Sequence, residues 1–357
     1  MFLSSSTTLI AVDIGSHSIK LAQLGKLRKG YELLAFGTLP LQHESIVEGK
    51  VKNFDDVVET LTKLVKAENM KDKFAAASVA GEAVIIKKIK MPQLPQKALA
   101  EKIQGEAEQY IPFDVDDVSM DFQVLEADTR KKPAETKDEV EVLLVAVQRE
   151  TIDSHADILS EAGLKPVIMD LDVLAMMNAA NLSEDLGQIG VVALIDLGAS
   201  FTHINIVSGG LTHFTRDFRF GGSQCTEKLM TDLDIPFAEA EALKQGRIPD
   251  GTEKETVTKI IVDSFEPIFE EIQKSLEGFE ETEGRPVDQL LLSGGGALIS
   301  GVNNLFERKL GLPVKTLNPL KTIKINRKKF SLDFVEEMAP IATVALGLAI
   351  RRFDYIK

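Results

Sequence analysis

Two aspartates, Asp13 and Asp196, each end an apolar run and precede a glycine by two residues. The first lies in "LIAVDIGSHSIK" and the second in "VALIDLGASFTH", with Gly15 and Gly198 at matching places. A glycine-containing turn lets backbone N–H groups approach a phosphate closely, because glycine has no Cβ. A carboxylate beside such a turn faces phosphates only across a cation, and Mg²⁺ takes one or two carboxylates with waters and phosphate oxygens. The pair therefore predicts a magnesium-triphosphate site between two similar units.

A third glycine-rich segment, "LLLSGGGALISG", carries Gly294, Gly295 and Gly296 directly after an apolar strand. Backbone without side chains lets a flat adenine and its ribose lie close, and a helix that follows would add a partial positive charge. Each motif alone is also typical of an ordinary tight turn. Two matched Asp-x-Gly turns followed by strand-GGG-helix, in this order, form a much rarer combination, which favours a nucleotide site.

Other chemistries have less support in the sequence. GxGxxG after the first strand and GxxxxGK[ST] are both absent, so the dinucleotide and P-loop motifs do not apply. The single cysteine, Cys225, allows no disulfide within the chain and has no local histidine partner, so we expect a small buried side chain. The histidines show no close metal-ligand spacing; they are His17, His43, His155, His203 and His213.

The charge balance and hydropathy limit the class of partner. The 357 residues carry a net charge of −14, which repels nucleic acid and anionic lipid. The most basic stretch, "KTIKINRKKF" (321–330), is typical of a solvated strand or loop. No window approaches the roughly 18 apolar residues needed to span a bilayer, and the first residues lack the pattern of a signal peptide. We therefore expect a cytoplasmic protein with no direct membrane insertion and no nucleic-acid partner.

The elements of the first half form one α/β layer and an insert. Three strands are predicted over 9–39, followed by a helix with Asn53 as its N-cap and a buried strand at "KFAAASVAG". From about 84 to 166 the pattern changes to a helix that stops before Pro112, two strands and a second helix ended by Gly163. The charged loop "DTRKKPAETKDE" between the two strands reads as an exposed hairpin tip.

The second half starts again at residue 190 with the strand and turn that echo the first. A strand then leads to Gly221 and Gly222, a helix over 226–244 broken by Pro236, and a long helix over 255–279. A final helix lies in "APIATVALGLAIRRF". This internal repeat predicts an α/β fold of two duplicated domains around a nucleotide cleft, with a small α+β subdomain inserted in the first.

The order of these motifs resembles the actin, heat-shock and sugar-kinase ATPase superfamily. "AVDIGSHSIK" resembles its phosphate 1 motif, "VIMDLDVLAMMNA" connect 1, "ALIDLGASFT" phosphate 2, "LLLSGGGALISG" adenosine and "APIATVALGLAIRR" connect 2. Within it, "EAEQYIPF", "FGGSQCTEKLM", "AEALK" and "LGLAIRRF" resemble the PilM family of type IV pilus assembly, which is close to FtsA. The resemblance implies an actin-like ATPase fold that binds ATP and Mg²⁺.

The resemblance also implies a division into four subdomains. Subdomain IA would comprise 1–85, 166–189 and 332–357, with the inserted subdomain IC at 86–165. Subdomain IIA would comprise 190–224 and 286–331, and subdomain IIB 225–285.

Site residues follow from the same resemblance, motif by motif. Asp13 and Asp196 would orient Mg²⁺, mostly through water. The phosphates would be held by Gly15, Ser16, His17 and Ser18, with Gly198, Ala199 and Ser200 opposite. The ribose would lie at Gly221 and Gly222 with Glu227 and Lys228 nearby, and the adenosine at Gly294, Gly295 and Gly296. Asp170 occupies the connect 1 place that orients the attacking water in hydrolytic relatives; an acid that caps the next helix is the alternative.

The implied function is an ATP-binding scaffold of the inner-membrane pilus assembly platform, recruited to the membrane through protein partners. The resemblance implies binding of the short cytoplasmic N-terminal segment of PilN, in its complex with PilO, and contact with the pilus motor ATPases. The residues leave open whether ATP is hydrolysed slowly or only held. Two other functions also stay open: an FtsA- or MreB-like filament-forming ATPase, and a small-molecule kinase, which would need a second pocket with an acid placed as base.

Overall fold

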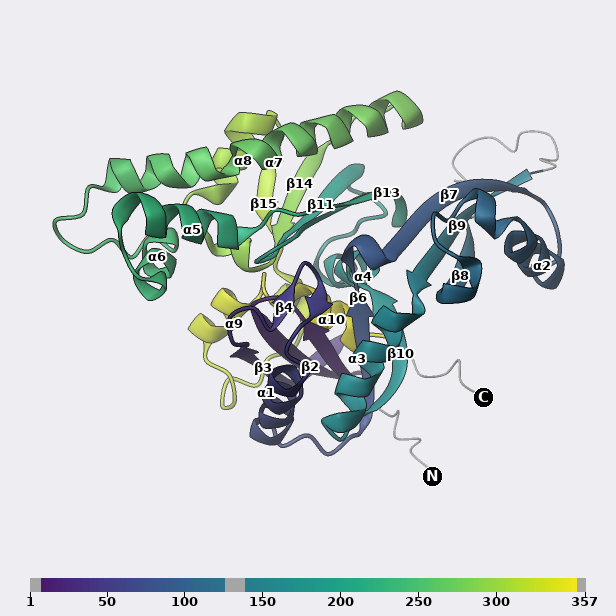
Figure 1. Cartoon of the computed structure of the whole chain (residues 1–357), viewed down its shortest axis with the longest axis horizontal. Helices are drawn as coiled ribbons and strands as arrows, with labels where there is room; N and C mark the ends of the chain where they lie inside the picture. Colours follow the sequence, from purple (N-terminus) through teal and green to yellow (C-terminus); the bar gives the residue numbers. More distant parts are fainter. Residues whose placement is uncertain (1–7, 126–138, 352–357) are drawn as a thin grey trace.

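The first α/β domain is built on a five-stranded sheet with strand order β10-β6-β1-β2-β3. The structure is a computed structural model that describes residues 8–125 and 139–351. The central strands are almost wholly buried because helices cover both faces of the sheet. Figure 1 shows this domain below the second one. The strands are β1 (Ile10–Ile14), β2 (Ser18–Lys26), β3 (Tyr31–Pro40), β6 (Phe74–Val79) and β10 (Lys165–Leu171).

Two pairs of helices cover this sheet. α1 (Phe54–Ala67) and α3 (Arg149–Glu161) pack on one face, where Val57 and Ile158 join the cluster around Val12. α4 (Asp172–Ser183) and α10 (Thr343–Ala349) pack on the other. The predicted N-cap of α1 is confirmed, since the Asn53 side chain accepts a hydrogen bond from the Asp56 N–H at 3.2 Å. A short hairpin of β4 (Ile46–Val47) and β5 (Lys50–Val51) and the helix α9 (Leu332–Met338) complete the domain.

The second domain repeats the first strand for strand. Its sheet has the order β13-β12-β11-β14-β15, so that β11 stands where β1 stands, between an antiparallel and a parallel neighbour. Asp13 pairs in register with Lys20, and Asp196 pairs with His203 at the same place in its hairpin. The predicted duplication is therefore confirmed. The strands are β11 (Val191–Leu197), β12 (Thr202–Ser208), β13 (Leu211–Phe218), β14 (Gln289–Ser293) and β15 (Val314–Thr316).

The helices of the second domain pack around the long helix α7 (Lys254–Glu283). Three aromatic rings, Phe265 and Phe269 of α7 and Phe306 of α8 (Val302–Leu310), meet edge to face in its core. The break predicted at Pro236 separates α5 (Gly222–Leu233) from α6 (Phe237–Lys244). In Figure 1, α7 crosses the top of the molecule from α6 toward the insert.

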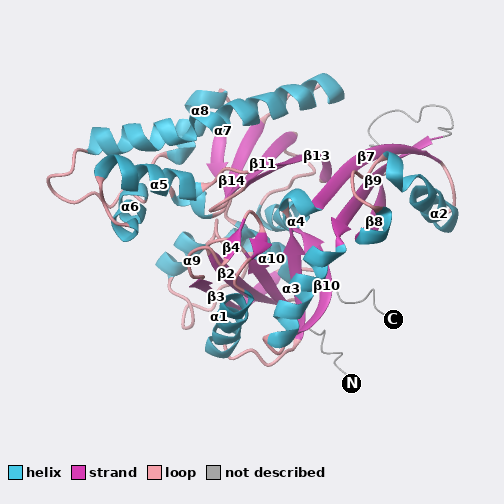
Figure 2. Ribbon diagram, viewed as in Figure 1, coloured by secondary structure: helices cyan, strands magenta, loops and turns pink. Residues whose placement is uncertain are grey.

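The insert carries its own antiparallel sheet of order β7-β9-β8. This sheet, β7 (Val84–Pro92), β8 (Val118–Leu125) and β9 (Glu139–Gln148), packs with α2 (Gln96–Glu106) beside the two domains (Figure 2). The predicted hairpin tip falls within 126–138, outside the described residues. The predicted division also placed α3 in the insert, whereas α3 packs on α1, β6 and β10. We therefore use "insert" for β7, α2, β8 and β9.

The segment after the three glycines differs from the predicted helix. A short 3₁₀ turn (Gly295–Leu298) follows β14, and α8 begins only at Val302. Gly294 has φ +80°, and a Cβ there would lie 2.5 Å from the Leu197 carbonyl oxygen. Close approach to the end of β11, and not helix initiation, therefore explains this glycine.

Two further features concern the surface. The basic stretch 321–330 lies along the edge of β3, where the Lys324 N–H donates to the Tyr31 carbonyl and the Leu33 N–H donates to the Lys324 carbonyl. It therefore covers a sheet edge that would otherwise be open. Among the described residues, no helix is both long and apolar enough to cross a bilayer.

Candidate functional site

A cleft of about 270 Å³ lies between the two domains, at the ends of β1, β11 and β14. Most residues expected at the site line this cleft, although the first and the last of them are more than 280 positions apart in the chain. These are Asp13, Gly15, Ser16, His17, Ser18, Asp196, Gly198, Ala199, Ser200, Gly222, Gly294, Gly295 and Gly296. The fold thus brings three separate motifs to one cavity.

The two Asp-x-Gly turns have the same geometry. The Gly15 N–H donates to the Ser18 carbonyl at 3.2 Å, and the Gly198 N–H donates to the Phe201 carbonyl at 2.9 Å. Each turn therefore closes on itself in the same way and presents its remaining backbone to the cleft from one domain.

Three carboxylates share the floor of this cleft: the expected Asp13 and Asp196, and Asp172 at the start of α4. Burial raises the pKa of Asp13; the Lys20 ammonium, 3.4 Å away, works against this, and the Asp196 charge adds to it. Burial and the Asp13 charge raise the pKa of Asp172 to about 6. The Ser293 hydroxyl donates to Asp196 Oδ1 at 2.8 Å. The three carboxylates therefore offer oxygen ligands, and the Lys20 ammonium balances only part of their negative charge.

A second cation, besides Lys20, balances part of this charge. His203 lies beside Asp196 in the β11–β12 hairpin, with Nδ1 2.7 Å from Asp217 Oδ1. Burial lowers the pKa of His203, but Asp217, Asp172 and Asp196 together outweigh it and raise the pKa to about 9. The ring is therefore an imidazolium at neutral pH. Our sequence reasoning found no role for His203, although its place opposite Asp196 in the repeat gave a usable signal.

A buried lysine marks the end of the cleft near α5 and α6. Lys244 Nζ donates to the Gly222 carbonyl at 3.1 Å, to Thr226 Oγ1 at 2.7 Å and to Glu241 Oε1 at 2.5 Å. Both Glu241 and Lys244 line the cavity. They belong to the "AEALK" segment, which resembles the PilM family but was not predicted to lie at the site.

Three of the residues expected at the ribose do not line the cavity. Glu227 is exposed, and Lys228 pairs with Asp232 at 2.9 Å along α5. Gly221 packs behind the Asp-x-Gly turn of the second domain, where a Cβ would lie 2.4 Å from the Ala199 carbonyl oxygen. Only the first residues of α5 reach the cleft, because α6 folds back and occupies the remaining wall.

Asp170 also lies outside the cleft. Its Oδ1 accepts from the Leu171 N–H at 2.9 Å, and its Oδ2 lies 3.0 Å from Nε of Arg351. Burial raises the pKa of Asp170, and Arg351 opposes that rise. Because β10 ends at Leu171 and Asp172 starts α4, it is Asp172 that faces the cavity.

Contacts across the cleft mouth join the two domains. The His17 ring stacks on Phe237 of α6 with centroids 6.4 Å apart. Arg219, after β13, pairs with Glu48 at 2.8 Å and with Glu82 at 2.5 Å. Asp217 Oδ2 also accepts from the Gly81 N–H at 2.8 Å. We call this arrangement, in which the two domains contact each other beside the cleft, closed.

Comparisons with known proteins agree with this architecture. The family model described as type IV pilus assembly protein PilM matches residues 11–353. A chain of a solved PilM-PilN type IV pilus biogenesis complex is 25% identical, with a TM-score of 0.83 over 96% of this chain and 98% of that one. The cell division protein FtsA of Neisseria meningitidis is 24% identical over 349 residues, covering 86% of this chain and 83% of FtsA.

A more distant likeness concerns the fold alone. MreB5 of Spiroplasma citri, solved with bound ADP, is 13% identical with a TM-score of 0.51, over 96% of this chain and 95% of MreB5. The expected actin-like fold is therefore confirmed.

Proposed function

Since the chain belongs to the PilM family of type IV pilus assembly proteins, we propose that it is an ATP-binding scaffold of the inner-membrane pilus assembly platform. The observation that carries the nucleotide part is the pair of equivalent Asp-x-Gly turns facing one cavity, with Gly294 to Gly296 completing its wall. MreB5, which shares the fold, was solved with ADP in place. The turns hold the phosphates, and the three glycines lie against the adenosine.

The donors in the cleft suit a hard divalent cation. Among residues 8–125 and 139–351, no cluster of three or more acidic, histidine or cysteine side chains forms a metal cage. Mg²⁺ needs no such cage, because one or two carboxylates, waters and phosphate oxygens complete its shell. Asp13 and Asp196 are the carboxylates we assign to it. When bound, the ion neutralises phosphate charge that the three acids would otherwise repel.

Other residues of this chain position the nucleotide. Glu241 and Lys244, rather than Glu227 and Lys228, face the ribose, since they line the cavity. Asp172, rather than Asp170, is the carboxylate placed to orient a water toward the phosphates. The support for this is its position in the cleft wall and its closeness to the charge of Asp13. In this proposal ATP binding sets the conformation of the two domains, and hydrolysis is slow or absent.

The proposed partner is the N-terminal cytoplasmic segment of PilN, which links the scaffold to PilO and to the inner membrane. The support is the likeness to a chain of a PilM-PilN complex over nearly the whole length of both chains. In this proposal the protein stays on the cytoplasmic side and reaches the membrane only through its partners. Contact with the pilus motor ATPases is part of the same proposal.

The decisive experiment measures ATP binding and turnover with and without a synthetic peptide of the PilN N-terminus from the same genome. We expect Mg²⁺-dependent ATP binding, specific peptide binding and little turnover. Asp13→Ala and Asp196→Ala should weaken Mg²⁺-ATP binding while peptide binding survives. Fast turnover stimulated by a small polar metabolite would instead indicate a kinase, and sedimentable polymers formed with ATP would indicate an FtsA-like filament. Unchanged ATP affinity in Asp196→Ala would contradict the site assignment.

A further inference from the structure

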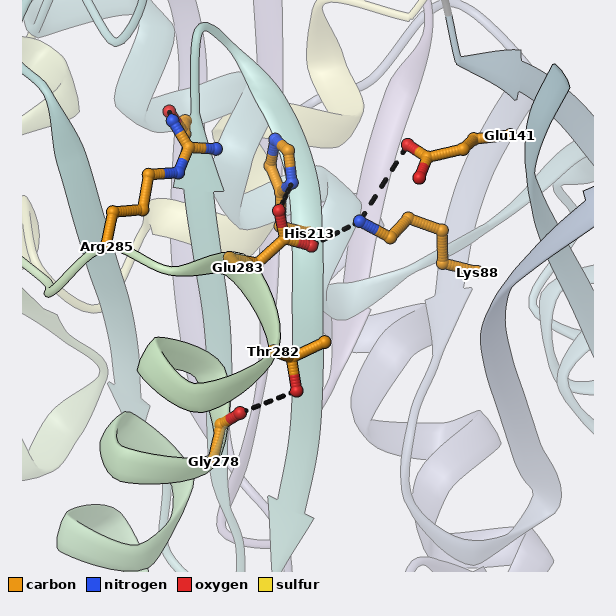
Figure 3. Close-up of polar contacts among 8 residues, drawn as sticks. Lys88, Glu141, His213, Gly278, Thr282, Glu283 and Arg285 are labelled. Atoms are coloured by element: carbon orange, nitrogen blue, oxygen red, sulfur yellow. Dashed lines mark hydrogen bonds and ion pairs between the residues drawn. The ribbon is translucent and has the colours of Figure 1, made fainter.

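A polar cluster outside the cleft joins the insert to the second domain. Lys88 of β7 pairs with Glu283, the last residue of α7, although 195 positions separate them. Lys88 Nζ also lies 3.9 Å from Glu141 of the neighbouring strand β9. Figure 3 shows Glu283 between the Lys88 ammonium and the His213 ring of β13. The side chains are mostly buried, with 21% of Lys88 and 17% of Glu283 exposed.

The charges of this cluster identify Lys88 as the partner of Glu283. Burial lowers the pKa of His213, and the nearby Lys88 and Arg285 charges lower it further, although Glu283 opposes them. His213 is therefore neutral at pH 7, and its Nδ1 lies 3.5 Å from Glu283 Oε2. Arg285 is directed elsewhere, since its Nη1 donates to Ser208 Oγ at 2.8 Å. Burial raises the pKa of Glu283, but Lys88 and His213 outweigh it, and the group stays ionised.

The helix that ends at Glu283 packs on two helices whose residues line the nucleotide cleft. α7 is continuous over 30 residues despite Pro267, a length of about 45 Å. Its first half packs on α5 and α6, whose residues line the cavity. Phe220, directly before the Gly221-Gly222 turn, lies edge-on to Phe265 of α7 with centroids 5.3 Å apart. One helix thus runs from the helices that line the cleft to the insert (Figure 1).

We propose that α7 transmits nucleotide occupancy of the cleft to the insert, and that the Lys88–Glu283 pair is the contact through which it does so. A rigid helix that packs on α5 and α6 at one end and contacts the insert at the other transmits a displacement if it has two arrangements, and a nucleotide held by α5 and α6 favours one of them. The insert then changes its position relative to the second domain as the cleft fills. This inference rests on the proposed nucleotide binding and adds a path and a contact that act on the insert.

The test is a distance measurement between spin labels on the insert and on α7. Ser119 of β8 and Glu270 of α7 are exposed, and no side-chain hydrogen bond or ion pair is described for either. Ser119→Cys and Glu270→Cys are introduced with Cys225→Ala, so that only the two new thiols carry labels. Pulsed electron–electron double resonance gives the distance between the labels with and without a non-hydrolysable ATP analogue and Mg²⁺. A fluorescent analogue titrated into each variant reports nucleotide binding independently.

Matched variants separate the contact from a general change of charge. Glu283→Gln and Lys88→Gln each remove one partner, and the double variant tests whether they act together. Glu281→Gln and Lys90→Gln make the same changes two residues away along the helix and along the strand, at exposed side chains. We expect nucleotide to shift the distance in wild type and in both controls. The shift should be lost in each partner variant, with no further loss in the double variant.

The outcomes are distinguishable from a failure of the proposed function. If the wild type binds no nucleotide, the proposed function fails, and this inference fails with it. If nucleotide binds but the distance does not change, only the inference is overturned. The same holds if Glu283→Gln responds like the wild type, or if Glu281→Gln loses the response as well.

Discussion

Charge in the cleft is unevenly balanced at the level of single side chains. Asp13, Asp172 and Asp196 approach one another, while Lys20 and the His203 imidazolium oppose only part of their repulsion. An ion that binds there relieves an existing electrostatic cost, because like charges in a water-poor region disfavour one another. In the proposed function, the site would therefore favour a nucleotide that arrives with its cation.

The first prediction separates the two carboxylates of the connect 1 segment. The ratio of ATP affinity in magnesium to ATP affinity in chelator should fall about tenfold in Asp172→Asn, equivalent to about 1.4 kcal/mol. The reason is that ATP without its cation meets one negative charge fewer in the cleft. Asp170→Asn should leave that ratio unchanged, since Asp170 pairs with Arg351 outside the cavity. Calorimetric titration with ATP, in magnesium and in chelator, measures both. An equal effect of the two substitutions would contradict the assignment of Asp172.

The second prediction concerns stability against pH. The pKa of Asp172 rises from 3.8 to about 6 on folding, so the folded state binds more protons than the unfolded state between these values. The contribution of Asp172 to the free energy of unfolding is fully present below pH 4 and is lost as the pH rises through 6. Asp172→Asn should therefore stabilise the ligand-free protein at pH 8, by up to roughly 3 kcal/mol. Denaturant unfolding at pH 4.5, 6 and 8 measures the gain, which should shrink toward acid; a gain independent of pH would contradict this account.

A contact between α4 and α10 decides how closely these two helices approach each other on one face of the first sheet. Gly347 of α10 lies against α4, where a Cβ would be 1.8 Å from the Ala175 carbonyl oxygen. Gly278 of α7 is helical too, but nothing lies within 4 Å of the place its Cβ would take. The same residue type thus has a packing role in one helix and none in the other.

The third prediction uses this contrast. Gly347→Ala should destabilise the protein by roughly 3 kcal/mol, because backbone atoms cannot yield to the added methyl group as a flexible side chain would. Gly278→Ala should stabilise it by up to about 1 kcal/mol, since alanine is the better helix former in open space. Chemical unfolding of the two variants gives both values. Similar effects at the two positions would show that α4 and α10 do not pack as described.

The closed arrangement of the two domains depends on contacts at the cleft mouth as well as on any bound nucleotide. Arg219 reaches from the second domain to Glu48 and Glu82 of the first, and the His17–Phe237 stack is a separate contact between the two domains. These groups are exposed and contribute little to folding, but they act directly on opening. The α7 contact with Lys88 lies away from this opening, at the insert.

The fourth prediction is that Arg219→Ala releases nucleotide several-fold faster while the protein keeps its unfolding midpoint. The substitution removes both ion pairs across the mouth, so the open arrangement becomes more populated. Stopped-flow displacement of a fluorescent ATP analogue gives the rate. Arg216→Ala is the control, because Arg216 pairs with Glu271 inside the second domain at 2.9 Å. Equal acceleration in both variants would argue against a role of Arg219 in closure.

The sequence by itself determined the duplicated α/β architecture and the three turns of the site. Apolar strands and the glycines of the two Asp-x-Gly turns are local properties that recur in both halves at matching places, and the Asn53 cap is a local property of one helix. Only the tertiary structure decided which side chains reach the cavity. It selected Asp172 over Asp170, and Glu241 and Lys244 over Glu227 and Lys228, and it moved α3 from the insert to the first sheet. The physical reason is that the face an element turns toward the cleft depends on how the chain folds back after it, and sequence spacing does not record that path.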